Sequence, residues 1–208
     1  MPRTADHDQR RFQLTQAARA VADDNGLKGL TVARVAQRAG VSVGLVQHYF
    51  PSKDQLVART YEHLLDGLND RVARIVEQGE ESGATIRDMS VRALAELLPL
   101  DDDRKREAML RAEFRALACH SAPLAEIART HDATFRARLA AVVVNATVCG
   151  EADAQVDADR AGADLWMTAV GAEAGSLLDA GYPALDAVEA ATQRVFPGQC
   201  RRNRSRGA

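Results

Sequence analysis

Apolar residues recur at intervals of three and four along most of this chain of 208 residues, and runs that alternate apolar with polar residues are nearly absent. The clearest stripe contains Leu56, Leu64, Leu68, Val72 and Ile75, which would cover one face of a helix of about seven turns. Because this spacing matches the period of an α-helix and not that of a strand, the pattern predicts an all-α protein. Gly and Pro punctuation divides the pattern into about nine helices.

Segment 31–50 has the features of two short helices joined by a tight turn. Thr31 and Ser42 are suitable N-cap residues for the two helices. Gly40 can adopt the left-handed conformation that the turn requires, and Ala36 is small enough for the two helices to cross closely. Residues 8–25, with Phe12 predicted on the inner face, would form the helix beneath them. These features predict a three-helix head of the helix-turn-helix type.

The second short helix of this motif is the candidate recognition helix. Gln and His side chains can read base edges, Val can contact a thymine methyl group, and Tyr can reach a phosphate. Lys53, at the start of the following helix, is placed to meet the DNA backbone together with that helix's amide groups. The alternative is an ordinary helical hairpin with an exposed face of no function. The residues predicted to face DNA from this helix are Val43, Gly44, Gln47, His48 and Tyr49.

Charge is distributed unevenly although the formal net charge is only -2. Residues 1–60 contain nine Lys or Arg and five Asp or Glu, a net charge of +4, whereas residues 61–200 contain fourteen and twenty-four, a net charge of -10. This contrast indicates two parts of the chain with different functions. We predict a DNA-binding domain at 8–68, an effector-binding and dimerisation domain at 69–197, and a disordered basic tail at 198–208.

The sequence lacks the signatures of several other classes of protein. The cysteines are three in number, without a CxxC pair, which favours a reduced cytoplasmic chain with neither disulfides nor a zinc site. There is no apolar signal segment or membrane-spanning run. No HExxH, phosphate-binding loop or GxSxG motif is present, and Cys119 and His120, as neighbours on a helix, point in different directions. We therefore expect no enzyme, no metal, no cofactor and no membrane partner.

The stretch GLKGLTVARVAQRAGVSVGLVQHYFPSKDQLV resembles the TetR family of bacterial transcriptional regulators. The resemblance extends over roughly 8–68, and GVSVGLVQHYF is most similar to the betaine-regulator, or BetI-like, branch. It implies an all-α homodimer with a DNA-binding head and a C-terminal helical bundle for dimerisation and a small molecule. Ala33 departs from relatives that have a base-reading arginine there. The family's DNA-contact roles fall on Thr31, Ser42, Val43, Gly44, Gln47, His48, Tyr49 and Lys53.

The segment ADLWMTAVGAEAGSLLDAG is rich in small residues that allow helices to pack closely. With the final helix it is predicted to form a four-helix interface between two copies of the chain, as expected for a palindromic site. The alternative is a helix buried within one chain. Apolar contacts in this interface are expected from Leu165, Val170, Leu177, Leu178, Val188 and Val195.

A ligand pocket is predicted from polar and aromatic residues in the middle of the chain. The alternative is that they form surface ion pairs and ordinary core. A choline-type ligand would need an aromatic cage, and the few aromatic residues do not support one, so a largely apolar ligand fits better. The candidates are Arg111, Glu113, Phe114, Arg115, His120, His131 and Trp166.

Together these features predict a DNA-binding transcriptional regulator, in particular a repressor that a small molecule releases from a palindromic operator. Its expected partners are double-stranded DNA, a second copy of the chain and an effector of unknown identity. A helical interaction module that has lost DNA binding is the alternative, and it would require a damaged recognition helix.

Overall fold

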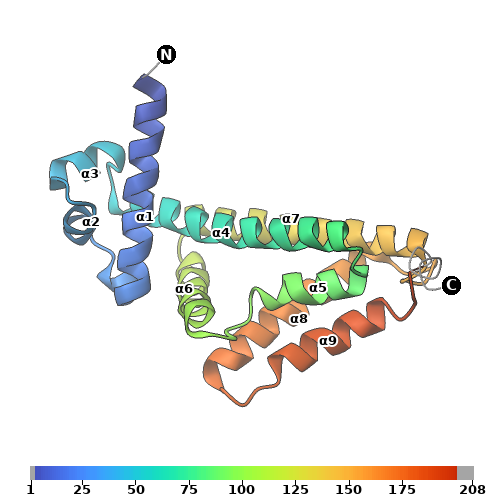
Figure 1. The fold of residues 1–208 in the computed structure, drawn as a ribbon. Helices are drawn as coiled ribbons and strands as arrows, with labels where there is room; N and C mark the ends of the chain where they lie inside the picture. Colours follow the sequence, from blue (N-terminus) through green and yellow to red (C-terminus); the bar gives the residue numbers. More distant parts are fainter. Residues whose placement is uncertain (1–2, 201–208) are drawn as a thin grey trace. The chain divides into compact units, whose positions relative to one another are not determined.

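The computed structural model describes residues 3–200, which contain nine α-helices and no strand. The all-α prediction is thus confirmed for the described chain. The helices form two compact units (Figure 1). The first unit comprises the chain up to Gly67 together with Met109–Ala128, and the second comprises Leu68–Ala108 and the chain from Arg129 onward. The predicted basic tail at 198–208 lies outside the described residues from position 201 on.

The first unit contains α1 (Arg3–Gly29), α2 (Val32–Ala39) and α3 (Val43–Tyr49), followed by the first part of α4 (Lys53–Ser82). It also contains the second part of α6 (Asp102–Ala118) and the start of α7 (Ala122–Cys149). Its core includes Leu14, Ala18, Val46, Leu56 and Phe114, each at most 1 % exposed. Burial of such side chains is the main favourable term in folding.

The position of Phe12 on α1 differs from the prediction. Phe12 is 49 % exposed and contacts the ring of His63, with 5.4 Å between ring centroids, whereas Leu14 and Ala18 are buried. The helix is also interrupted at Gly26, whose positive φ of 65° is a conformation that favours glycine. A further helical turn follows, and its start is fixed by the Glu113 carboxylate, which accepts a hydrogen bond from the Leu27 N–H at 2.7 Å.

The second unit contains the rest of α4, α6 and α7, with α5 (Ile86–Ala95), α8 (Ala158–Leu178) and α9 (Ala184–Val195). Helices α8 and α9 run side by side (Figure 1). Gly162 allows α8 to approach α7 closely, since a Cβ there would lie 2.6 Å from the backbone nitrogen of Ala140. Leu165 and Val188, both predicted to face a second copy, are 1 % exposed and belong to the core of this unit. For these two residues the dimer-interface prediction is wrong.

An ion-pair network joins α4, the end of α5 and α6 within the second unit. Arg71 donates to Glu96 at 2.7 Å and to Glu107 at 2.5 Å. Burial opposes the charge of Arg71, but the carboxylates of Glu107 and Glu96 outweigh it and raise the pKa of the guanidinium. The network therefore keeps these three helices in register. No described helix combines the length and the apolar character needed to cross a membrane.

Candidate nucleic-acid interface

The turn between α2 and α3 has the geometry that the sequence predicted. Gly40 is left-handed, with φ 66° and ψ 35°. The Val41 N–H donates to the Ala36 carbonyl at 3.0 Å and the Gly40 N–H to the Gln37 carbonyl at 3.2 Å, which is the hydrogen-bond pattern of a Schellman motif. Ala36 is buried at the crossing. These local interactions fix the direction in which α3 leaves the turn.

Both predicted N-caps are present. The Thr31 side-chain oxygen accepts from the Arg34 N–H at 3.3 Å, and that of Ser42 accepts from the Leu45 N–H at 3.2 Å. Ser52 caps α4 in the same way, through the Gln55 N–H at 3.1 Å. Because a hydroxyl has one donor besides its acceptor lone pairs, each cap leaves an O–H free to reach a phosphate oxygen. A structural and a DNA-binding role are therefore compatible at Thr31 and Ser42.

Helix α3 buries one side and exposes the other. Val46 and the following Phe50 are buried in the head, and Phe50 also receives the Arg11 guanidinium 5.8 Å above its ring. Among the predicted DNA-facing residues, Tyr49 is half-buried and packs against the core of the head, and the others lie on the exposed side. The exposed ones are Val43, Gly44, Gln47 and His48.

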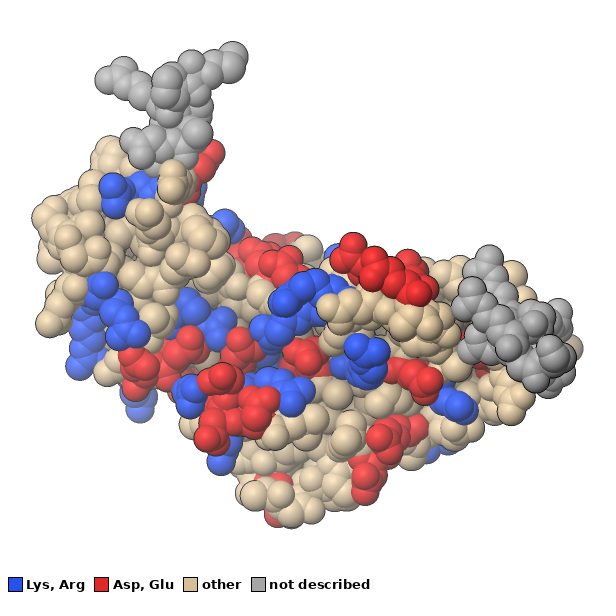
Figure 2. Space-filling view, in the orientation of Figure 1, with Lys and Arg blue, Asp and Glu red and all other residues tan. Residues whose placement is uncertain are grey.

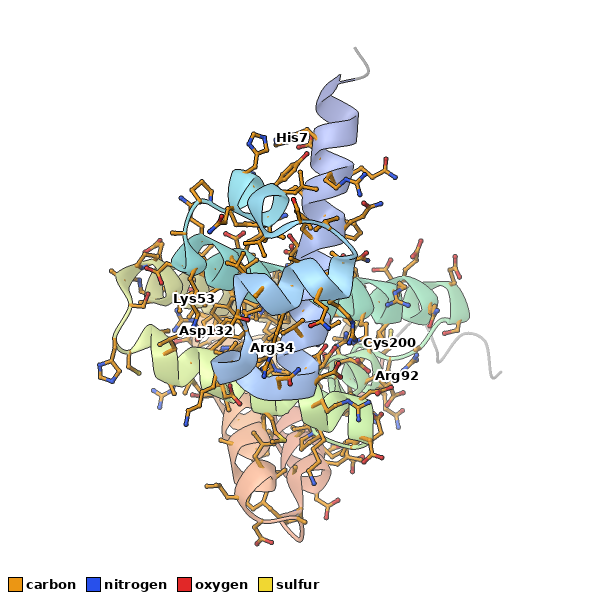
Figure 3. All side chains as sticks on the ribbon, turned by 90° about the vertical axis from the view of Figure 1, so that its left-hand side faces the viewer. His7, Arg34, Lys53, Arg92, Asp132 and Cys200 are labelled. Carbon is orange, nitrogen blue, oxygen red and sulfur yellow. The ribbon has the colours of Figure 1, made fainter. Side chains whose placement is uncertain are left out.

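The surface around α3 carries few charges. In Figure 2 the region over α3, at the left, is mostly in the colour of uncharged residues, with Lys and Arg side chains beside it. Figure 3 views this side of the head and labels Arg34 and Lys53, both exposed. Arg34 donates to the Gly29 carbonyl at 3.2 Å, and Arg38 is paired with Asp24 at 2.9 Å. Cations thus flank the exposed and largely uncharged face of α3.

Sequence reasoning missed one residue of this surface. Helix α1 begins at Arg3, before the predicted start at Asp8. Its first turns carry His7, whose ring centroid is 4.5 Å from that of Tyr49 and 6.5 Å from that of His48. Figure 3 labels His7 above the helix-turn-helix. The contact joins two segments that are far apart in the sequence, so no local pattern predicted it.

The predicted pocket residues are divided between the two units. Arg111, Phe114, Arg115 and His120 belong to the first unit, and His131 and Trp166 belong to the second. Phe114 is buried and stacks on Tyr61, with 4.4 Å between centroids, and His120 is exposed. Glu113 supports α1 as described above.

In the second unit, His131, Phe135 and Trp166 form an aromatic cluster. Phe135 stacks on Trp166 at 4.6 Å, and the His131 ring is 4.7 Å from Phe135 and 5.8 Å from Trp166. Within the described chain, the indole N–H of Trp166 and Nε2 of His131 are buried without a hydrogen-bond partner. Buried polar atoms usually have a hydrogen-bond partner, so these two atoms are candidates for contact with a small molecule.

The geometry defines the class first: this is a helix-turn-helix head of the DNA-binding type, carried on a helical bundle. Residues 14–60 match the model of bacterial regulatory proteins of the tetR family, and residues 86–200 match that of the C-terminal part of BetI-type transcriptional repressors. The chain belongs to the TetR family and is BetI-like.

Individual relatives agree with this assignment. The chain is 46% identical over 82 residues to the HTH-type transcriptional regulator BetI 1 of Chromohalobacter salexigens, covering 39% of this chain and 41% of that protein. It is 27% identical over 135 residues to the HTH-type transcriptional regulator PksA of Bacillus subtilis, covering 65% and 63%. These matches span less than two thirds of the length of either relative.

Among solved structures, a transcriptional regulator from Rhodococcus sp. Rha1 is similar with a TM-score of 0.75 and 33% identity, covering 89% of this chain and 95% of that one. Because the matching families and relatives are transcriptional regulators, the prediction of a regulator and not an enzyme is confirmed.

Proposed function

We propose that this chain is a repressor that binds a palindromic operator as a homodimer and is released by a small molecule held in its second unit. The proposal rests on the structure of α3, whose N-cap, preceding turn and buried face are all formed. Val43, Gly44, Gln47 and His48 of this helix are exposed and would be the surface that reads the bases. This argues against an interaction module with a damaged recognition helix. Affinity would come mainly from phosphate contacts and would fall steeply with salt.

The test is a selection of binding sites from a random duplex pool, with the purified full chain at about physiological salt. An enriched palindrome is the expected result, and its half-site spacing would report the separation of the two heads. Failure of a folded protein to enrich any sequence would contradict the proposal. A variant with Gln47→Ala and His48→Ala serves as the matched control, because it keeps the buried face of α3 and should lose the enrichment.

We assign dimerisation to the outer face of α8 and α9. A groove of about 690 Å³ lies on this face, lined by Arg160, Asp164, Met167, Thr168 and Arg194 among others. Met167 is 58 % exposed and Leu178 is 93 % exposed, and a Cβ on Gly171 would meet no atom within 4 Å. Exposed apolar side chains beside open backbone suit a second copy of the same face, as in an isologous interface.

We assign effector binding to the aromatic cluster of the second unit. An apolar molecule with a hydrogen-bond acceptor would satisfy the Trp166 N–H while it packs against Phe135. His131 would add a second polar contact through Nε2. Such a ligand agrees with the apolar character of the surrounding helices.

The effector assignment can be tested with compounds that release the selected operator. Trp166→Phe keeps an aromatic ring but removes the indole N–H together with the five-membered ring, so we expect a higher effector concentration to be needed while operator affinity stays unchanged. His131→Ala should act in the same direction, and His120→Ala, an exposed residue, is the matched control. Equal effector sensitivity in all of these variants would contradict the assignment. Because Trp166 is the single tryptophan, its fluorescence in the unaltered chain reports binding directly.

A further inference from the structure

Two cysteines and a carboxylate converge at the C-terminal end of α7. The sulfur atoms of Cys149 and Cys200 and a carboxylate oxygen of Glu151 all lie within 4.8 Å of one another. Cys149 ends α7 and Glu151 lies two positions further on, while Cys200, labelled in Figure 3, comes from the segment after α9. The spacing of cysteines in the sequence predicted no zinc site, because these ligands come from two distant segments of the chain.

The backbone holds the two segments together. Gly150 has a left-handed φ of 91° and turns the chain after α7. The Gly198 N–H donates to the Glu151 carbonyl at 2.9 Å. A Cβ on Gly198 would lie 2.1 Å from the Gly150 carbonyl oxygen, so only glycine permits this approach. The position of Cys200 beside Cys149 therefore follows from a fixed contact two residues earlier.

The carboxylate of Glu151 is also fixed. Glu151 is 2 % exposed, and its two oxygens accept from the N–H groups of Ile86 and Arg87, each at 3.0 Å. A carboxylate has about four lone pairs, so these bonds leave capacity on both oxygens. The Cys149 thiol uses one, at 3.6 Å from Oε1. Both thiols are only partly buried, so water can reach them.

The two thiols and the carboxylate are groups that bind a cation in their deprotonated forms. A divalent cation between them would neutralise the negative charges that these forms bring together.

We propose that Cys149, Cys200 and Glu151 bind a thiophilic divalent cation of the zinc class, with water as the fourth ligand. Two thiolates, one carboxylate and a water are a ligand set that zinc accepts. Binding forms two metal–sulfur bonds and releases the two thiol protons to solvent, so no oxidant or reductant is needed. The ion would tie the start of α5, the end of α7 and the segment after α9 together. This site does not depend on the DNA-binding proposal.

The test uses the reduced full chain, with zinc in competition with a chromophoric chelator and with cadmium as a spectroscopic probe. We expect one ion per chain and thiolate-to-cadmium charge-transfer absorption in the ultraviolet. Loss of a group that only supports a metal ligand weakens metal binding by about 10- to 100-fold. Cys149→Ser and Cys200→Ser each remove a ligand itself, so each should weaken zinc binding by more than that. Cys119→Ser, which removes an exposed thiol of the other unit, is the matched control and should bind as the unaltered chain does.

Thermal unfolding followed by circular dichroism without metal checks that the serine variants are folded. Zinc should raise the midpoint of the unaltered chain and of Cys119→Ser, but not those of the other two. Zinc binding that is equal in all variants would overturn the proposal. Failure of zinc to bind the unaltered chain would also overturn the proposal. This includes the case in which peroxide readily forms a disulfide between Cys149 and Cys200 while neither zinc nor cadmium binds.

Discussion

The ring of His7 lies 4.5 Å from the ring of Tyr49, so the first turns of α1 contact the C-terminal end of α3. Tyr49 also has the ring of His48 at 5.3 Å, in an edge-on orientation. The side chain of Tyr49 is therefore held between two imidazoles, one from its own helix and one from α1. This contact restricts the orientation of a residue predicted to reach the DNA backbone.

We expect His7→Ala to weaken operator binding while the fold stays intact. Aromatic pairs contribute about 0.5–1.5 kcal/mol beyond area burial, which corresponds to a few-fold to tenfold loss of affinity if the contact orders Tyr49 for DNA. Fluorescence anisotropy with the selected operator measures the change. His120→Ala removes an exposed histidine that is remote in sequence from α3, and it should leave affinity unchanged. An equal loss in both variants would show that the His7 contact is irrelevant.

Gln47 and Lys53 should differ in the kind of binding that they support. Gln47→Ala is expected to weaken specific binding by about 1–3 kcal/mol and to spare non-specific binding, because it removes a base contact. Lys53→Ala should weaken binding to operator and random DNA alike and flatten the salt dependence, because it removes a phosphate contact. Salt titrations on both DNAs distinguish the two. A Gln47 variant that loses equally on random DNA, or a Lys53 variant with an unchanged slope, would refute the respective role.

Gly44→Ala should separate stability from DNA binding. A Cβ at this position would have only the Ser42 Oγ nearby, at 4.0 Å, so the protein itself has room for it. Replacing a helical glycine should therefore stabilise the head by about 0.5–1 kcal/mol. If α3 approaches the duplex closely at Gly44, operator affinity falls although the protein is more stable. Denaturant unfolding and operator titration measure the two effects, and unchanged operator affinity would argue against close approach.

Met167→Asp should dissociate the proposed dimer. An unpaired carboxylate buried in an interface costs about 3 kcal/mol or more, which raises the dissociation constant about a hundredfold. Sedimentation velocity over a range of concentrations measures it. Met109→Asp places the same charge at a similarly exposed methionine of the first unit and is the control. A Met167→Asp protein that remains dimeric would exclude the centre of this face from the interface.

Asp101 should make the stability of α6 depend on pH. The Arg104 N–H donates to its carboxylate at 2.8 Å, and this backbone hydrogen bond, with the Arg104 side chain, holds the pKa of Asp101 below its usual value. A depressed pKa means that the contribution is present above the ordinary pKa of aspartate and is lost as pH falls through the lower, folded value. Asp101→Ala should therefore lower the thermal midpoint at neutral pH and have a smaller effect in acid. If the thermal midpoints of Asp101→Ala and the unaltered chain differed by the same amount at every pH, this account would be contradicted.

The helix-turn-helix could be predicted in detail because its determinants are local. Thr31, Ser42 and Ser52 cap the helices that follow them, and Gly40 takes the conformation that few other residues accept. Each of these signals acts within a few residues. The sequence alone therefore contained both the turn and the direction of the exposed face.

Features that depend on distant segments could not be predicted in this way. Phe12 was predicted on the inner face of α1, but it is exposed and contacts the ring of His63 of α4, a residue more than fifty positions away. The burial of Leu165 and Val188 depends on how α8 meets its neighbours in the same chain. The contact of His7 with Tyr49 and the convergence of Cys149 with Cys200 likewise join residues that have no relation along the sequence.

The stacking of Phe114 on Tyr61 has a consequence for how such regulators can be recombined. Leu110, Phe114, Ala118 and Leu124 belong to the core of the head although they follow it by more than forty positions. A head excised at residue 68 would expose the apolar side of Tyr61 and lose the Glu113 support of Leu27. Exchange of DNA specificity between relatives should therefore transplant the outward side chains of α3 onto an otherwise unaltered chain, because the head cannot be moved as a cassette.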